Sequence, residues 1–365
     1  MSIKKNMIPK EQLQKTFIEL MMINEIYPNE NEVLIYTKKR LTDAGVAWED
    51  DSFRNIVAKI PGQGEAILLS THLDIPEPLP NPDYTIDGDV IRSNGTGILG
   101  ADPKTGLAVL IEFLAVMAKR DHSTHRPIEV LLTRGEETGL LGALQADYSL
   151  LSAKIGLVLD EDGPVTQVVI KAPAMIKMDA TIIGKIVHPR EPENGINALH
   201  AACDALMSLP WGYSTEGVTW NVGIFQSGTA RNSVPGSVTF QAELRSFETE
   251  KALSEMHRVT KTIEDVVQKH GAKCEIKNTL EFSGYALTQD HPLFERLEKT
   301  FASMSLKPNY FETFGGSDAT VFNAKGIRCV PIGSGYYNAH QYTEEANIQD
   351  MQTIGEFLDQ FVKND

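Results

Sequence analysis

Histidines and carboxylates stand at the ends of apolar, strand-like runs in separate segments of this chain. Imidazole and carboxylate groups are side chains that hold zinc in hydrolytic sites. Strand ends in an open α/β sheet form the edge at which ligands bind, so we expect these groups to converge there. The chemistry that fits them is hydrolysis at two divalent metal ions. The segments are Ser70-Thr71-His72-Leu73-Asp74, Gly100-Ala101-Asp102-Pro103-Lys104, Arg134-Gly135-Glu136-Glu137-Thr138, Leu157-Val158-Leu159-Asp160 and Asn338-Ala339-His340.

The first two segments each have an alternative interpretation. His72 and Asp74 follow the apolar run 66–70, and the imidazole can face a metal while the carboxylate orients the ring. The His-x-Asp triplet alone is a weak signal. Asp102 precedes Pro103, which is also the pattern of a helix N-cap followed by proline at the first helical position. If Asp102 is a ligand, it is the best candidate to bridge two metals.

Glu136 and Glu137 follow the apolar run 128–133 and are flanked by glycines. Two acids are also favoured by the helix dipole in the first turn of a helix, here one beginning near Leu140. Adjacent carboxylates in a confined site repel unless cations or a shared proton intervene, so closeness to His72 favours a metal. Glu137 is then a ligand, and Glu136 takes the proton from the attacking water.

Asp160 ends another apolar run, and His340 follows a glycine-rich segment after the run 328–332. Each alone is equally a loop carboxylate or a surface histidine, but their coincidence with the other segments favours ligands. Three carboxylates leave two divalent cations with one positive charge, which a bridging hydroxide neutralises. A ligand set of His, Asp and Glu suits zinc best, with cobalt or manganese as alternatives.

Length and charge narrow the class of protein. The 365 residues exceed the usual size of one hydrophobic core, so we expect two domains. The formal charge of -15, without a basic stripe, argues against nucleic acid and anionic membrane as partners. There is no apolar run of about 20 residues, and residues 1–20 lack the apolar core of a signal peptide. Three widely spaced cysteines fit a reducing compartment. The expected location is the cytoplasm.

The order of elements predicts an α/β domain with an insertion. Continuously apolar runs at 66–70, 128–133 and 155–159, with a helix at 106–119, indicate a mainly parallel sheet sandwiched by helices. From 176 to 285 the order is β-α-β-β-α-β, and strand 238–245 alternates apolar and polar residues. We therefore predict a catalytic metal-binding domain at 1–175 and 286–365, with an inserted split-βαβ domain at 176–285.

The motifs resemble those of the M20 family of co-catalytic metallopeptidases, most closely its peptidase T-like, tripeptide aminopeptidase branch. The resemblance covers nearly the whole chain. It is carried by Ser-Thr-His-Leu-Asp, Gly-Ala-Asp-x-Lys-x-Gly, Gly-Glu-Glu-x-Gly, Gly-Lys-Ile-Val-His-Pro, Asn-Ser-Val-Pro, Gly-Gly-Ser-Asp-Ala and the late Asn-x-His.

The resemblance implies a role for each candidate in the metal site. One zinc is held by His72, Asp102 and Asp160, and the other by Asp102, Glu137 and His340. Glu136 is the general base, and Asp74 is the partner of His72. Aspartate at position 160 is typical of aminopeptidase and dipeptidase members, whereas carboxypeptidase-like members typically carry glutamate.

The resemblance also implies that the inserted domain is a lid, through which many members form dimers. His188, Asn232 and Arg245 match lid positions that contact the tetrahedral intermediate or the substrate carboxylate, although each is also an ordinary solvated side chain. Two positions depart from the pattern. Pro103 replaces the usual Asp or Asn, and Arg190 replaces the usual glycine after His188-Pro189, which leaves the preferred peptide length open.

The expected function is therefore that of a two-zinc aminopeptidase acting on di- and tripeptides, with a homodimer formed through the lid. The alternatives are another amide hydrolase on the same scaffold, such as an N-acyl amino acid deacylase or a carboxypeptidase, and a non-catalytic peptide- or metal-binding protein.

Overall fold

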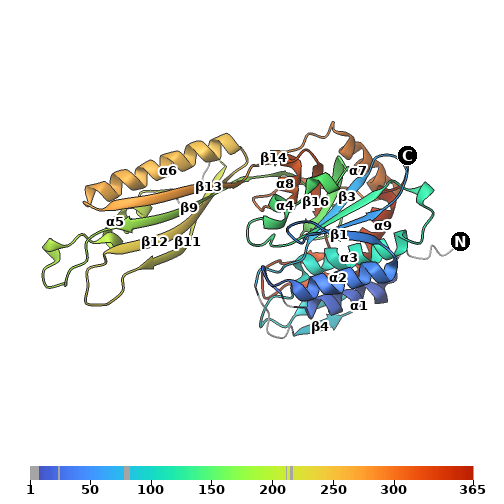
Figure 1. Cartoon of the computed structure of the whole chain (residues 1–365), viewed down its shortest axis with the longest axis horizontal. Coiled ribbons are helices and arrows are strands. Elements are labelled where there is room, and N and C mark those ends of the chain that lie inside the picture. The colour runs from blue at the N-terminus through green and yellow to red at the C-terminus, as the bar shows by residue number, and fades with distance from the viewer. Residues whose placement is uncertain (1–7, 24, 78–82, 211, 214–216, 365) are drawn as a thin grey trace. The chain divides into compact units, whose positions relative to one another are not determined.

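The computed structural model describes residues 8–23, 25–77, 83–210, 212–213 and 217–364. The chain divides into two compact units (Figure 1). Unit 1 comprises Met1–Ile170, Leu287–Glu312 and Gly316–Asp365, and unit 2 comprises Lys171–Ala286 and Thr313–Gly315. The division proposed from the sequence has its boundaries at 175/176 and 285/286 and assigns 313–315 to the catalytic part.

The main sheet of the described residues has nine strands, and its four central strands, β6-β3-β7-β16, are parallel. Burial on both faces explains why these strands consist mostly of apolar residues. The parallel core confirms the predicted α/β class, although antiparallel strands extend it on both sides. In sheet order the strands are β1 Ala47–Asp50, β2 Ile56–Ile60, β6 Ile128–Thr133, β3 Ile67–His72, β7 Ile155–Glu161, β16 Arg328–Gly333, β8 Gln167–Ala172 and β14 Tyr285–Ala286, and β15 Asn309–Glu312 also pairs with β8.

Helices pack against this sheet. The helix α3 is buried almost all round, as a helix between a sheet and an outer helical layer must be. The outer helices α1 and α9 pack on α3, while α8 packs against β16 and β7. The helices of unit 1 are α1 Lys10–Met21, α2 Asn31–Ala44, α3 Ala101–Met117, α4 Leu141–Gln145, α7 Pro292–Ser303, α8 Asp318–Ala324 and α9 Ile348–Phe361, with short 3-10 turns at His122–Thr124 and Tyr148–Leu150.

A second, smaller sheet in unit 1 brings two distant segments together. Its order is β17-β18-β5-β4, with bounds Tyr336–Tyr337, Glu345–Asn347, Val90–Ser93 and Tyr84–Asp87. Because β18 pairs with β5, the segment that carries His340 lies beside the segment that leads into α3.

Unit 2 is an antiparallel sheet, β10-β11-β12-β9-β13, whose one face is covered by α5 and α6. The order β9-α5-β11-β12-α6-β13 is the predicted β-α-β-β-α-β, with the short strand β10 in addition. The bounds are β9 Ala174–Ile183, a 3-10 turn Pro192–Asn194, α5 Ala198–Met207, β10 Gly212–Tyr213, β11 Val218–Ser227, β12 Ser237–Ser246, α6 Thr249–Lys269 and β13 Lys273–Phe282.

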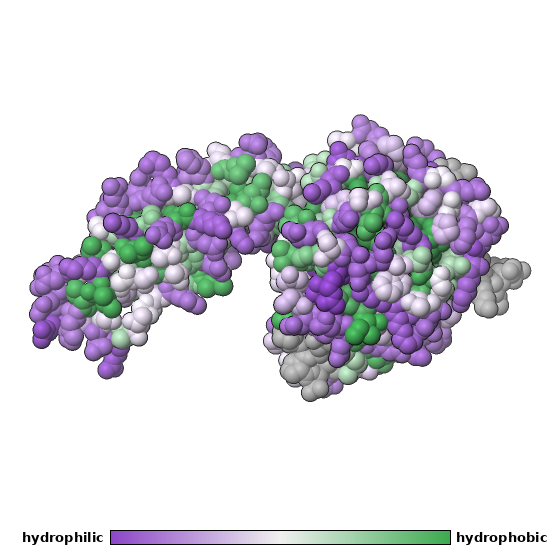
Figure 2. Space-filling view, in the orientation of Figure 1, coloured by the Kyte–Doolittle hydropathy of each residue, from purple (hydrophilic) through white to green (hydrophobic). Residues whose placement is uncertain are grey.

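The surface is largely polar on the face drawn in Figure 2, in keeping with the acidic composition. Among the described residues, no helix is both long and apolar enough to span a membrane.

Gly156 keeps the strands under the predicted site closely packed. A Cβ at this position would lie 2.5 Å from the carbonyl oxygen of Leu68 on the neighbouring strand. We expect Gly156→Ala to lower the free energy of unfolding by about 1–3 kcal/mol, measured by urea denaturation, because the backbone must shift. Gly223→Ala is the control, since the nearest atom there is 3.8 Å away. Equal effects of the two substitutions would contradict this account.

Candidate metal centre

The end of β3 brings His72 against two aspartates. Its Nε2 lies 3.0 Å from Oδ1 of Asp102 and 3.4 Å from Oδ1 of Asp160. His72 ends β3 and Asp160 lies near the end of β7, and since these strands are parallel neighbours their carboxyl ends meet at one edge. His72 is 1% exposed, so this contact is buried.

Asp102 stands at a kink near the start of α3. Its φ of -79° and ψ of 115° lie outside the helical region and Pro103 follows it, so its backbone has the arrangement of an N-cap before the long part of the helix, as the N-cap interpretation expects. A residue before proline is pushed out of that region by the proline ring, which frees this side chain from the helix. Its carboxylate lies between His72 and His340, whose Nε2 is 3.3 Å from Oδ2.

Glu137 and His340 complete a second group with Asp102. Nε2 of His340 lies 3.1 Å from Oε1 of Glu137, and the His340 side chain is about half exposed. His340 has a positive φ of 60° in the loop between β17 and β18, so its ring reaches the site from a sharp turn. This placement differs from that of an ordinary surface histidine.

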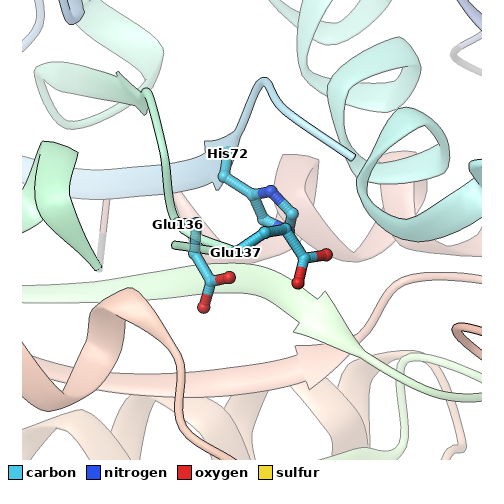
Figure 3. Close-up of side chains that lie close together, drawn as sticks. All are labelled: His72, Glu136 and Glu137. Carbon is cyan, nitrogen blue, oxygen red and sulfur yellow. The ribbon is translucent and has the colours of Figure 1, made fainter. Parts of the chain in front are cut away.

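Glu136 and Glu137 lie in a turn before α4 rather than in its first helical turn, because the helix begins at Leu141. Figure 3 shows both side chains beside His72. The backbone N–H groups of Glu136 and Glu137 donate to Asp74, at 3.0 and 3.2 Å. Asp74 also lies 3.5 Å from Nδ1 of His72, longer than an ordinary hydrogen bond. Asp74 therefore supports the Glu136–Glu137 turn as well as facing the His72 ring.

The acids and imidazoles shift one another's pKa values strongly. Burial raises the pKa of Asp160 to about 7, against the opposing effect of His72. Burial would raise the pKa of Asp102, but hydrogen bonds from His340 and His72 hold it below its ordinary range. Hydrogen bonds to Asp102 and Glu137 raise the pKa of His340 to about 10. These shifts favour the ionised form of Asp102 and the charged form of His340.

Glu136 is the most strongly perturbed acid of the turn. Burial raises its pKa well above the ordinary value, and the charges of Asp160, Glu137 and Asp318 raise it further against the effect of His72. A raised pKa makes the carboxylate of Glu136 a stronger proton acceptor than an exposed glutamate, which suits a general base.

The geometry fits a pair of divalent ions. Ligand atoms around one tetrahedral zinc lie about 3.3 Å apart, because Zn–N and Zn–O distances are about 2.0–2.1 Å. The four contacts given above range from 3.0 to 3.4 Å. Oε1 of Glu137 is buried and faces Nε2 of His340. Potential ligand atoms converge in three groups: His72, Asp102 and Asp160; Asp102, Glu137 and His340; and His72, Glu136 and Glu137.

The remaining sequence candidates belong to unit 2. His188 and Asn232 are exposed, and Nδ1 of His188 accepts the backbone N–H of Arg190 at 3.2 Å. Arg245 donates from Nε to Glu243 at 3.0 Å and from Nη1 to the carbonyl of Phe314 at 2.8 Å. Their contact with substrate stays a prediction.

Three supporting residues were not assigned this position from the sequence. Glu30 and Glu344 are buried and accept backbone N–H groups of the site's loops. Asp318 belongs to the Gly-Gly-Ser-Asp-Ala motif, but Ser317 and not Asp318 is the N-cap of α8. The buried Asp318 side chain instead hydrogen-bonds Thr133, and burial raises its pKa to about 6. Glu344 lies four residues after His340 and Asp318 lies in a motif, whereas Glu30 lies in none of the motifs given above.

Comparison with known proteins shows similarity to peptidases. Residues 172–274 match the peptidase dimerisation domain of the M20 peptidases, and residues 55–180 match peptidase family M28. The uncharacterized protein YqjE of Bacillus subtilis is 31% identical, over 96% of this chain and 98% of its own length. Peptidase T of Aliivibrio salmonicida is 25% identical, over 80% of this chain and 72% of its own.

Solved structures share the complete fold. Aminopeptidase PepT from Bacillus cereus and a tripeptidase from Staphylococcus aureus are each 29% identical over 98% of both chains, with TM-scores of 0.84 and 0.89. YXEP of Bacillus subtilis, a dinuclear metal binding peptidase from the M20 family, is 17% identical over 97% of both chains and shares the fold at a TM-score of 0.72. The chain therefore belongs to the M20 peptidases of the peptidase T type and is a metal-dependent peptidase.

Proposed function

We propose that this chain is a two-zinc aminopeptidase that removes the N-terminal residue of di- and tripeptides. The observation that carries the proposal is the position of Asp102 between two groups of ligand atoms, one with His72 and Asp160 and the other with Glu137 and His340. The names of the similar structures, an aminopeptidase and a tripeptidase, support the substrate class.

The five residues would hold the two ions with Asp102 shared. Oxygen and nitrogen donors without thiolate suit zinc, with cobalt and manganese as alternatives. When bound, the ions polarise the scissile carbonyl and lower the pKa of the attacking water.

Glu136 moves the proton in this scheme. Its carboxylate accepts a proton from the attacking water and then delivers it to the leaving amine nitrogen. The raised pKa of Glu136 suits this role, because it favours uptake of the proton from water. Asp74 keeps Glu136 in place through the backbone of the turn.

Unit 2 would bind the far end of the peptide. The Arg245 guanidinium uses three of its N–H groups in the bonds to Glu243 and Phe314, which leaves two for a substrate carboxylate. His188 and Asn232 are exposed and would contact the intermediate. The match to a dimerisation domain supports a homodimer formed through unit 2.

Blocking the substrate's amino terminus distinguishes this function from its rival. We expect rapid release of the first residue from a free tripeptide and no cleavage of the same peptide after N-acetylation, measured by chromatography of the products. An N-acyl amino acid deacylase would instead cleave the acetylated substrate, and a carboxypeptidase would release the last residue from both. Either outcome would overturn the proposed aminopeptidase activity.

A further inference from the structure

We propose that two buried glutamates outside the ligand set, Glu30 and Glu344, are positioning residues that set different parts of the metal centre. Glu344 fixes the loop that presents the shared ligand Asp102, and Glu30 fixes the turn that presents Glu136. The assignment of what each one positions rests on the function proposed above.

Glu344 gathers the backbone N–H groups that lead into α3. Its Oε2 accepts from Leu99 and Gly100, at 2.5 and 2.7 Å, and its Oε1 accepts from Asp102 at 3.1 Å. Glu344 is 1% exposed, so water does not compete for these donors. The backbone of Asp102 is held non-helical between Gly100 and Pro103, and the carboxylate of Glu344 satisfies the donors that this bend leaves outside the helix.

The location of Glu344 couples the two loops of the second ligand group. It lies just before β18, in the same short segment as His340, and β18 pairs with β5 next to the loop that contains Asp102. A shift of Glu344 therefore moves His340 and Asp102 relative to each other, and both are proposed ligands of the same ion.

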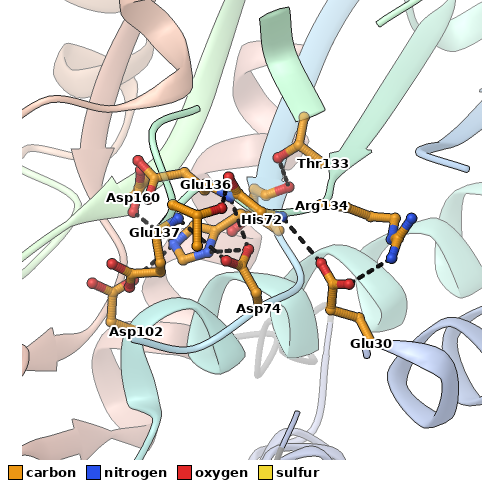
Figure 4. Close-up of polar contacts among 12 residues, drawn as sticks. Glu30, His72, Asp74, Asp102, Thr133, Arg134, Glu136, Glu137 and Asp160 are labelled. Carbon is orange, nitrogen blue, oxygen red and sulfur yellow. Dashed lines mark hydrogen bonds and ion pairs between the residues drawn. The ribbon is translucent and has the colours of Figure 1, made fainter. Parts of the chain in front are cut away.

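Glu30 holds the turn that carries Glu136, as Glu344 holds the loop that carries Asp102. Its Oε1 accepts the N–H of Gly135 at 3.1 Å, and its Oε2 accepts from the Arg134 guanidinium at 2.6 Å (Figure 4). Asp74 accepts the next two N–H groups, those of Glu136 and Glu137. Three successive N–H groups thus point at buried carboxylates, which fixes the direction in which the Glu136 side chain leaves the turn.

The fit around this turn is tight. Gly135 has φ 62°, and a Cβ there would lie 2.7 Å from the Tyr27 ring. Glu30 itself is completely buried. Its contacts are with Arg134 and with the N–H of Gly135, the residue directly before the general base, so Glu30 should affect turnover more than metal binding.

Glutamine substitutions test the two roles against each other. The amide keeps the volume of glutamate but has one acceptor oxygen, and its NH2 faces groups that are themselves donors. Glu112→Gln is the matched control: Glu112 is also buried and paired with an arginine, Arg40, but it lies among α1, α2 and α3. Glu30→Asp and Glu344→Asp keep the negative charge but shorten the side chain. They test the same two roles if a glutamine variant does not fold.

The full-length variants are measured for zinc affinity and stoichiometry, the visible spectrum with cobalt, kcat and KM on a tripeptide, and thermal unfolding. We expect Glu344→Gln to weaken zinc binding about 10- to 100-fold, change the cobalt spectrum and regain activity in excess zinc. We expect Glu30→Gln still to bind two zinc ions, with a smaller change in affinity and spectrum than in Glu344→Gln, while kcat falls about 10- to 100-fold. The aspartate variants should show smaller changes of the same kind.

Several results would overturn the assignment. Wild-type zinc affinity in Glu344→Gln, unchanged kcat in Glu30→Gln, or the same losses in Glu112→Gln would each show that the glutamates only stabilise the fold. Failure of the proposed function looks different, because the unaltered protein would then lack two bound ions or aminopeptidase activity.

Discussion

Glu136→Gln should reduce kcat on a tripeptide by about 10²–10⁴-fold while the protein still binds two metal ions. Glutamine keeps the size of the side chain but cannot accept a proton from water. Glu136 lies beside the proposed ligands (Figure 4), but neither of the two ligand groups that contain Asp102 includes it. Steady-state kinetics on zinc-loaded protein, with elemental analysis of the same sample, measure both quantities.

Glu161→Gln is the control for that experiment. Glu161 is next to Asp160 and has no assigned role in the reaction. Burial and the charge of Asp160 raise the pKa of Glu161 to about 8, so glutamine resembles the protonated form present at neutral pH. Activity within a few-fold of the unaltered protein is expected for this variant. If Glu136→Gln retained the same activity as Glu161→Gln, Glu136 would not be the general base.

Asp102→Asn should remove both ions together. The amide has one uncharged oxygen where the carboxylate offers two, and Oδ1 and Oδ2 of Asp102 face His72 and His340 separately. We expect metal content to fall from two ions to less than one per chain, and activity to fall by about 10³-fold or more, since each ion contributes several kcal/mol to catalysis. Zinc titration calorimetry and kinetics measure these changes.

Asp160→Asn provides the comparison, because Asp160 belongs to the His72 group but not to the His340 group. This variant should lose affinity for one ion and retain the other. Two ions bound with normal affinity in Asp102→Asn would contradict a shared ligand, and so would an equal loss at both sites in Asp160→Asn.

The central strands and the polar residues at their ends were predictable from the sequence. The strands appear as short apolar runs, and the polar residues follow them directly. A strand buried on both faces is mostly apolar, as in β3, β6 and β7, and parallel strands place their carboxyl ends at one edge. His72 and Asp160 therefore followed from the pattern, as did the glutamates after β6. The split-βαβ order of unit 2 was predictable for the same reason, since its strands and helices have distinct periods.

Features set by distant contacts were not predictable in this way. Asp102-Pro103 looks like a helix start, and only its contacts with His72 and His340 show that the side chain faces elsewhere. The strands β17 and β18 have only two and three residues, too few for a periodic pattern, yet they hold the His340 loop. Glu30 lies far along the chain from Gly135, so no local spacing indicates that they meet.

Anomalous diffraction from crystals grown with zinc tests the shared-ligand claim most directly. The account predicts two zinc peaks about 3.5–4 Å apart, with one oxygen of Asp102 on each ion, His72 on the first and His340 on the second. A single peak, or two peaks of which Asp102 contacts only one, would contradict it.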